Sequence, residues 1–180
     1  MLKAIPRKQI EAVYLLGADE IDMAQLKGAF VIYQGHHGDR GAAAADVILP
    51  GAAYTEKSGT YVNVEGRVQR SLKAVSPPGD AKEDWKIIRA LSEKLGLPLP
   101  YNTREEVRDH LVAINPLFDE LDVVQRAPWV EFSYEGTISP DPFEPVIQNF
   151  YMTDPISRHS ITMAKCTREI LQKQVLHNET

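Results

Sequence analysis

The chain has 180 residues, of which 43% are hydrophobic and 25% charged, proportions typical of a globular protein and unlike those of a disordered one. Its 20 Lys and Arg residues and 25 Asp and Glu residues give a net charge of −5 without a basic stripe, which argues against nucleic acid as a partner. No apolar run approaches the ~20 residues of a membrane-spanning helix, so direct membrane insertion is not expected. Cys166 is the single cysteine, so this chain alone forms neither an internal disulfide nor a cysteine-based zinc or iron–sulfur site.

Three short apolar runs, each followed by turn residues, predict strands near the N-terminus. These runs are 12–16, 29–33 and 46–50. They are typical of buried strands that helices cover on both faces. Between the first two, Asp22 and Gln25 have the spacing of an N-cap and its capping-box partner, and Gly28 would end a short helix. The small-residue stretch 41–45 allows one or two helical turns, so the pattern predicts a βαβ unit and three parallel strands in one sheet.

Residues 60–71 alternate in polarity and predict a β-hairpin. Glu65 and Gly66 separate its two runs, and Gly66 supplies the positive φ of a tight bend. The surrounding polar segment, 54–69, fits either a pocket wall or a structural hairpin. In the structural interpretation the stabilising side chains are Glu56, Asn63, Glu65 and Arg67. Glu56 and Lys57 suit acid and base roles, but no nucleophile or oriented histidine accompanies them in the segment.

Two capped helices are predicted after the hairpin. The first begins at Asp80 with Glu83 three residues on, and Gly96 with Pro98 ends it. Its apolar face consists of Trp85, Ile88, Leu91 and Leu95.

The second helix begins at Thr103, with Glu106 at the third position of a capping box. Its inward residues are Val107, Leu111 and Ile114. Asn115 and Pro116 stop this helix and begin one more turn through Leu121.

Residues 127–150 show no hydrophobic period, and their scattered prolines predict an extended arm that lies along a surface. Its aromatic residues are Trp129, Phe132, Tyr134 and Phe143. They favour docking onto either the body of this chain or a neighbour. Asp154 and Pro155 then open a C-terminal helix within 151–180. Its apolar stripe is Ile156, Met163, Ile170 and Val175. The sequence thus predicts an α/β domain over 1–126, the arm and this helix.

The loop after the second strand carries His36, His37 and Asp39 between glycines. It lies where ligands bind in an open α/β sheet, at the carboxyl ends of the strands. A metal site would need further ligands, and adjacent histidines usually point apart, so local hydrogen bonds or a partner contact are favoured. The glycine spacing does not match a dinucleotide or P-loop fingerprint. Cys166, on the last helix, is expected to be a half-buried and inert thiol.

Several long motifs carry a family resemblance. The segments 31–39, 45–57 and 59–67 closely resemble the C-terminal region of the 75 kDa iron–sulfur subunit of respiratory complex I, NADH:ubiquinone oxidoreductase, and of its bacterial counterpart. The later signatures of that subunit are similar to 83–93, 149–158 and 163–166. The resemblance covers roughly residues 12–170 and places Met1 inside the large domain of the family subunit. A split gene, a truncated gene and an excised segment are all compatible with that position.

The resemblance implies part of a molybdopterin oxidoreductase-like domain, a mostly parallel α/β sheet with flanking helices. Segments such as 45–50 are shared with cofactor-binding relatives, whereas the complex I branch is regarded as lacking a working cofactor. The iron–sulfur clusters are expected in an N-terminal portion or a partner, so neither a catalytic residue nor a metal ligand is expected in this chain. Candidates for a relic cofactor pocket are His36, His37, Asp39, Glu56, Thr60, Asn63 and Arg67.

The function implied is structural: a scaffold in the NADH-oxidising peripheral arm of complex I, on the matrix side of the mitochondrial inner membrane or the cytoplasmic face of a bacterial plasma membrane. Its expected partners are the cluster-bearing portion of the same subunit and other peripheral-arm subunits. One alternative is the cofactor-binding portion of an active molybdopterin-dependent oxidoreductase, in which Thr60, Asn63 and the His36–His37 loop contact a pterin. A third is an independent small binding module. Bound molybdenum or pterin would favour the enzyme.

Overall fold

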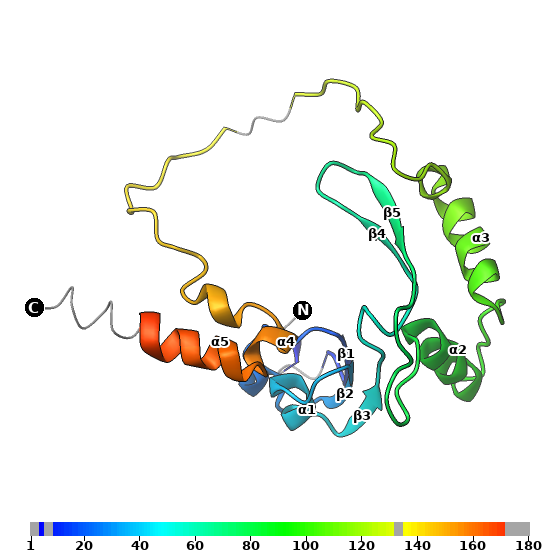
Figure 1. Ribbon diagram of the computed structural model, residues 1–180, viewed down its shortest axis with the longest axis horizontal. Coiled ribbons are helices and arrows are strands. Elements are labelled where there is room, and N and C mark those ends of the chain that lie inside the picture. The colour runs from blue at the N-terminus through cyan, green and yellow to red at the C-terminus, as the bar shows by residue number, and fades with distance from the viewer. Residues whose placement is uncertain (1–3, 6–8, 132–134, 172–180) are drawn as a thin grey trace, which may run out of the picture. The chain divides into compact units, whose positions relative to one another are not determined.

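The computed structural model describes residues 4–5, 9–131 and 135–171, and the chain divides after Ala127 into two units. The first unit contains β1 (Ala12–Leu16), η2 (Met23–Leu26), β2 (Phe30–Gly35), α1 (Arg40–Ala44), β3 (Val47–Pro50), β4 (Gly59–Val62), β5 (Val68–Ser71), α2 (Asp84–Lys94), α3 (Arg104–Ile114) and η3 (Pro116–Asp119) (Figure 1). The second contains η4 (Phe150–Met152), α4 (Pro155–Arg158), α5 (Ile161–Cys166) and a π-helical turn, η5 (Thr167–Leu171). The mixed α/β class expected from the sequence is confirmed, whereas the boundaries 1–126, 127–150 and 151–180 stay a prediction.

The predicted parallel sheet is confirmed, with strand order β1-β2-β3. Val13 pairs with Val31 and Leu15 with Tyr33, so these four side chains lie on one face, and all are buried. Leu26 of η2 completes the same cluster, and residues of α1 pack against it. Burying a Val or Leu side chain stabilises a fold by roughly 1.5–3 kcal/mol, so this face is the main source of stability in the sheet.

The other face of the sheet is only partly covered, since Gln34 on it is fully buried and bonds Asp84 of α2 while other side chains on it are exposed. The expectation of helices on both faces stays a prediction. Leu16 and Phe30 on that face are each 50% exposed. The chain crosses from β1 to β2 to β3 in one direction, and right-handed crossovers in one direction place their connecting segments on one face. Both η2 and α1 therefore cover the same side of the sheet.

The short connections differ from the predicted helices in detail. Asp22 is the N-cap of η2, as expected, but its carboxylate accepts from the Ala24 N–H and Gln25 forms no capping box. The element is a single 3₁₀ turn, because only a few residues separate the strands before Gly28 adopts φ +95°. In α1, a Cβ on Gly41 would lie 2.6 Å from the Tyr33 ring, so glycine lets this helix approach the core.

The predicted hairpin is present, with β4 and β5 antiparallel and Gly66 at φ +81° in the turn. Asn63 Oδ1 accepts from the N–H groups of Glu65 and Arg67, each at 3.0 Å, and holds the bend. Val68, fully buried, bridges to Leu121 beyond η3. The structural interpretation of this segment is correct for Asn63, Glu65 and Arg67.

The first predicted helix starts later than expected. Asp80 is not its N-cap, because residues 78–81 form a turn and Lys82 then pairs with Gly51 beside the sheet, so the helix begins only after Glu83. Gly96, at φ +75°, ends α2 as predicted.

The start of α3 is confirmed, with a complete Thr103–Glu106 capping box. Asn115 caps the extra turn η3, which ends at Asp119. Leu95 and Ile114 are exposed instead of inward, because each lies at a helix end beyond its packed face.

The second unit does not contain the single helix predicted over 151–180. Asp154 and Pro155 do open α4, but this helix ends at Arg158, and Ser160 starts α5 by accepting from the Met163 N–H at 3.3 Å. Serine competes for local backbone bonds and so begins a new helix here. Cys166 is half-buried, as expected. Val175 lies outside the described residues.

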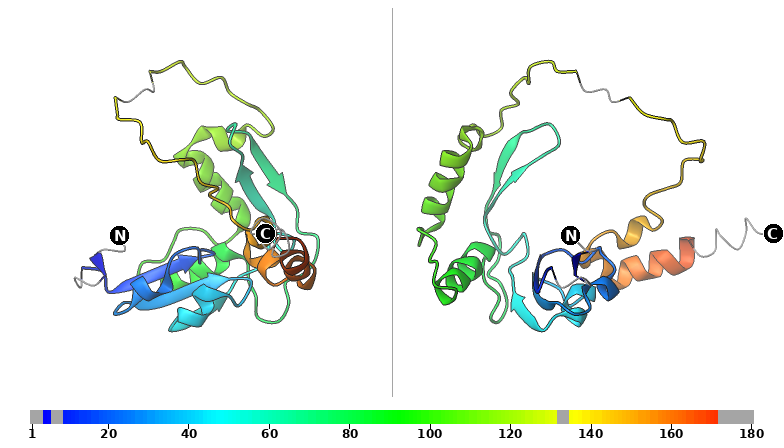
Figure 2. Two further views of the ribbon diagram at one scale, coloured as in Figure 1. Left: turned by 90° about the vertical axis from the view of Figure 1, so that its left-hand side faces the viewer. Right: turned by 180° about the vertical axis from the view of Figure 1, so that it is seen from behind.

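Residues 127–131 and 135–149 of the predicted arm contain neither helix nor strand, and Figure 2 shows them as an extended trace, whereas its last residue, Phe150, begins η4. Trp129 and Phe143 are exposed, whereas Phe132 and Tyr134 lie outside the described residues. Across the described ranges, no helix has both the length and the apolar character needed to cross a membrane.

Candidate functional site

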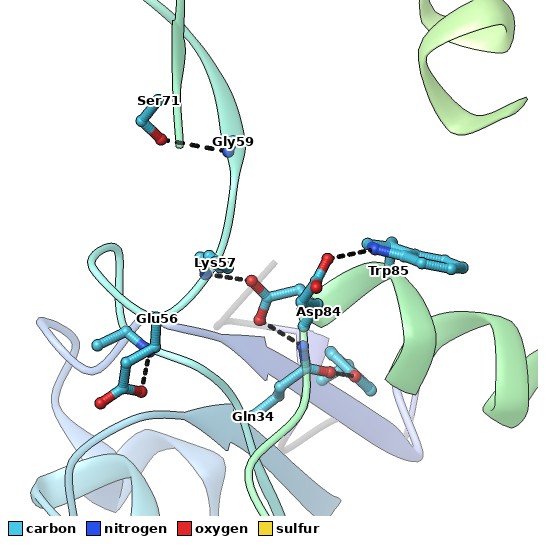
Figure 3. A network of polar contacts seen from close by, with 10 residues as sticks. Gln34, Glu56, Lys57, Gly59, Ser71, Asp84 and Trp85 are labelled. Atoms are coloured by element: carbon cyan, nitrogen blue, oxygen red, sulfur yellow. Dashed lines mark hydrogen bonds and ion pairs between the residues drawn. The ribbon is translucent and has the colours of Figure 1, made fainter. Parts of the chain in front are cut away.

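A network of buried and half-buried polar side chains lies at the carboxyl ends of the parallel strands (Figure 3). Its centre is Asp84, in the first turn of α2, which binds Gln34 of β2 through one carboxylate oxygen and Lys57 through the other. Tyr14 of β1 donates its hydroxyl proton to Gln34 Oε1. The site therefore joins two strands, the loop after β3 and a helix start.

Backbone pairing brings Asp84 to this edge. The Lys82 N–H donates to the Pro50 carbonyl at 3.1 Å, and the Ala52 N–H donates to the Lys82 carbonyl at 2.8 Å. These bonds attach the chain to the edge of the sheet, and α2 begins two residues later, at Asp84. A carboxylate in the first helical turn also interacts favourably with the positive end of the helix dipole. Gly51 leaves room for it, since a Cβ there would lie 3.1 Å from Asp84 Oδ1.

The network satisfies its own polar groups. Gln34 is fully buried and uses both ends of its amide, with Nε2 donating to Asp84 Oδ1 at 2.7 Å. The Lys57 and Asp84 side chains are 23% and 32% exposed, so water screens this ion pair only in part. Burial raises the pKa of Tyr14, and the Asp84 charge adds to that rise. Tyr14 therefore acts as a neutral hydrogen-bond donor.

The two predicted histidines lie beside this network, in the loop after β2. Their rings meet edge to face, with centroids 4.8 Å apart and the two Nδ1 atoms in contact, so the expectation that they point apart is wrong. The glycines around them allow this compact loop. Burial, then the charges of His37 and Lys57, lower the pKa of His36 against the opposing effect of Glu56 and Asp84.

Asp39 and Glu56 have local structural partners. Asp39 is the N-cap of α1 and accepts from the Arg40 N–H at 2.9 Å. Glu56 closes the turn after β3, because its Oε2 accepts from the Ala53 N–H at 2.9 Å. Glu56 thus belongs to this loop and does not stabilise the hairpin turn, which corrects the sequence-based interpretation.

The hairpin candidates lie elsewhere. Asn63 forms the hairpin turn, and Arg67 donates from its guanidinium to the Asp122 carbonyl at 2.7 Å. Thr60, on β4, lines a separate pocket of about 220 Å³ with Trp85 and residues of α3. The structure therefore gathers His36, His37 and Glu56 near Asp84 but does not bring Asn63 or Arg67 to them. Any cofactor-binding role of these residues stays a prediction.

Sequence reasoning missed Tyr14, Gln34 and Asp84. A signal existed for Gln34, a polar residue at the end of an otherwise apolar strand, because such a residue needs a buried partner. No local pattern points from it to Asp84, 50 positions away. Within the described residues, no group of three or more His, Cys, Asp or Glu side chains is arranged to hold a metal ion.

Two protein families match successive parts of the chain. Residues 1–94 match the family described as molybdopterin oxidoreductase, and residues 124–166 match the family described as the C-terminal part of the NADH-ubiquinone oxidoreductase G subunit.

Curated relatives match across both regions. The chain is 51% identical to the mitochondrial NADH-ubiquinone oxidoreductase 78 kDa subunit of Neurospora crassa over 86% of this chain and 22% of that protein. It is 55% identical to the Candida albicans 78 kDa subunit, over 86% of this chain and 23% of that protein. It is 49% identical to the NADH-quinone oxidoreductase G subunit of Rickettsia felis, over 90% of this chain and 24% of that protein. The chain thus spans less than a quarter of the length of these relatives.

Among solved structures, acetylene hydratase from Pelobacter acetylenicus has a similar fold, with a TM-score of 0.52 and 22% identity over 61% of this chain and 17% of that one. This likeness concerns the fold alone.

Proposed function

We propose, for a chain that belongs to the molybdopterin oxidoreductase family, that it serves as a structural portion of the NADH-oxidising peripheral arm of respiratory complex I. Its resemblance to the C-terminal region of the 75 kDa subunit is confirmed by the relatives. In this role it supports NADH-to-quinone electron transfer without binding an iron–sulfur cluster or catalysing a step. The identity of about half the residues across both units, with subunits named for this activity, carries the proposal.

The exposed arm supports a role in assembly. The apolar residues concerned are at least 44% exposed and comprise Trp129, Val130, Ile138, Phe143, Val146 and Ile147. Large exposed apolar residues that gather on one segment are typical of interaction sites. Acidic residues accompany them at Glu131, Glu135, Asp141 and Glu144. We therefore expect the arm to lie on a basic surface with apolar pockets, on the cluster-bearing portion of the subunit or on another peripheral-arm subunit.

The family also implies a molybdopterin cofactor, and the carboxyl edge of the sheet does not fit one. Lys57, the cation that could meet a cofactor phosphate there, is already paired with Asp84. The Gln34 amide likewise already accepts a hydrogen bond from Tyr14 and donates one to Asp84. A phosphate would face the Asp84 carboxylate and would have to break a satisfied network. These contacts support a self-contained structural network at this edge of the sheet.

The match of residues 1–94 to the molybdopterin oxidoreductase family favours a second candidate, a cofactor-binding portion of an active enzyme. This candidate requires that Lys57 be released from Asp84 when the cofactor binds. It predicts stoichiometric molybdenum or pterin in the purified protein, which the structural proposal does not.

The deciding experiment is purification of the tagged chain from its own source in mild detergent, with NADH oxidation, co-purifying proteins and molybdenum measured together. We expect a large NADH-oxidising assembly that contains a cysteine-rich partner. Its membrane fraction, mitochondrial inner membrane or bacterial plasma membrane, sets the location. A chain that elutes alone, or with stoichiometric molybdenum, would contradict the structural role.

Paired variants isolate the contribution of the arm. Phe143→Asp places a charge on the arm, and we expect it to reduce incorporation into the assembly at least severalfold because an apolar contact is lost. Val64→Asp changes a residue that is equally exposed but lies in the hairpin turn, and it should incorporate normally. Equal incorporation of both variants would contradict docking through the arm.

A further inference from the structure

A second pocket lies away from the polar network, between the hairpin and the two long helices of the first unit. Its volume is about 220 Å³. Ser58 and Thr60 form one wall, Trp85 of α2 a second, and Arg104 and Arg108 of α3 a third. Val107 and Leu111 add an apolar surface between them.

The arginines of this pocket have unused donors. Among the described residues, Arg104 Nε is buried without a hydrogen-bond partner, although the side chain as a whole is 35% exposed and its Nη2 lies 3.4 Å from Glu105 Oε1. Arg108 forms no hydrogen bond or ion pair with any residue that the structure describes, although its charge, like that of Arg104, attracts the Glu105 carboxylate. A buried cationic donor without a partner costs free energy, and two arginines one helical turn apart also repel each other. Glu105 offsets part of this repulsion, and an anion bound between the two arginines would offset more of it and give Arg104 Nε a partner.

The remaining lining residues narrow the chemistry of the ligand. The Thr60 hydroxyl, free of partners among the described residues, can donate to an oxyanion beside the guanidinium groups. Trp85 donates its Nε1–H outward to Glu83 at 2.8 Å, so the ring contributes an apolar wall to the pocket. Arginine pairs bind carboxylate and phosphate with particular strength because their donors match two oxygens.

We propose that this pocket binds a small oxyanion, a carboxylate or a phosphate, that carries a compact apolar body such as an aromatic ring. The oxyanion lies between Arg104 and Arg108, and the apolar body lies against Trp85 and Leu111. The volume is below the roughly 300 Å³ at which drug-sized pockets begin, which limits the ligand to about one ring. All of its residues belong to the first unit, so ligand binding here does not require that the arm dock onto a partner.

Tryptophan fluorescence provides the test. The chain has two tryptophans, so Trp129→Phe in the full chain leaves Trp85, in the pocket wall, as the only reporter. Phenyl phosphate, benzoate and inorganic phosphate are then titrated separately. We expect a saturable change with phenyl phosphate or benzoate, and weaker binding of inorganic phosphate, which lacks the apolar body.

Variants in this background separate the pocket from general electrostatics. Arg108→Gln should raise Kd about tenfold or more, because it removes a charge-assisted pair with the ligand, whereas within the protein it removes a charge attraction to the exposed Glu105 carboxylate and no hydrogen bond between described residues. Arg126→Gln, at an exposed site outside the pocket, should leave Kd unchanged. The absence of saturation up to about 10 mM, or equal losses in both variants, would overturn the proposal. Equal affinity for inorganic phosphate and phenyl phosphate would overturn the apolar half of the site.

Discussion

The parallel sheet of the first unit and the segment after Ala127 treat their apolar side chains in opposite ways. In the sheet, Val13, Leu15, Val31 and Tyr33 are at most 5% exposed and pack against one another. None of the described residues of the second unit is buried, and Ile138, Phe143 and Val146 stand almost fully in solvent. One region supplies its own core, whereas the other has apolar surface that only a further contact can cover.

The two family matches fall in these two regions, one in each. The self-sufficient region falls within the broad molybdopterin oxidoreductase match, residues 1–94, and the exposed region falls within the narrower match to the NADH-ubiquinone oxidoreductase G subunit, residues 124–166. A core that closes on itself can be shared by proteins with different partners. Exposed side chains, by contrast, are constrained by the surface that they meet. The narrower of the two family matches therefore lies in the region whose apolar side chains are exposed.

Truncating one aromatic residue in each region is the strongest way to break this comparison. Tyr33→Ala should lower the free energy of unfolding by about 3–5 kcal/mol, because it opens a cavity in a nearly closed core. Trp129→Ala, on the exposed arm, should change it by less than about 0.5 kcal/mol. Urea unfolding followed by circular dichroism measures both. A large effect of Trp129→Ala would mean that the arm contributes to the core stability of this chain.

Removing the central carboxylate tests whether the polar network is structural. Asp84→Ala leaves Lys57 and Gln34 without their partner, and we expect a loss of about 1–2 kcal/mol, reduced from a fully buried pair by partial exposure. The control Asp141→Ala removes an exposed hydrogen bond to Ser139 on the arm and should be nearly neutral.

A double-mutant cycle sharpens this second prediction. Lys57→Met combined with Asp84→Leu should be less destabilising than the sum of the two single changes, since no charge is then left unpaired. Strictly additive losses in the unfolding free energy would show that the pair does not act as a unit.

The two capping boxes allow the same comparison at helix ends. Thr103→Ala removes the cap of α3 in the first unit and should cost about 1 kcal/mol of global stability. Asp154→Ala removes the cap of α4, a helix of 4 residues in the second unit, and should affect only local helicity. Hydrogen exchange at Glu106 and Ser157, the capped N–H groups, distinguishes local from global opening. Equal losses of global stability would contradict the division into two independent units.

Local patterns were sufficient to predict the features that depend on few neighbours. The three strands follow from their apolar runs, Gly66 from the bend it permits, and the Thr103 cap from its spacing to Glu106. Each of these is decided within about six residues of sequence. The resemblance of the longer motifs to the complex I subunit was also readable without a structure.

Long-range contacts account for what the sequence could not reveal. The local sequence favours Asp80 as the N-cap of the helix, but Lys82 pairs with the edge of the sheet, so the helix starts at Asp84. The Gln34–Asp84 bond depends on that shift, so neither partner could be identified locally. The exposure of Leu16 and Phe30 likewise follows from crossover direction, which places η2 and α1 on the opposite face of the sheet and which the apolar runs do not encode.

The smallest predicted effect concerns the histidine loop beside the network. Burial and the positive neighbours His37 and Lys57 hold the pKa of His36 below its ordinary value of 6.5, despite Glu56 and Asp84. The unfolded chain therefore binds more protons than the folded one between the lowered pKa and 6.5, so stability falls as pH decreases through this window and returns above it. Unfolding midpoints between about pH 7.5 and about pH 5.5 should show this slope. His36→Gln should flatten it and the exposed His110→Gln should not; an unchanged slope in His36→Gln would assign the pH response to other groups and remove this loop from the network.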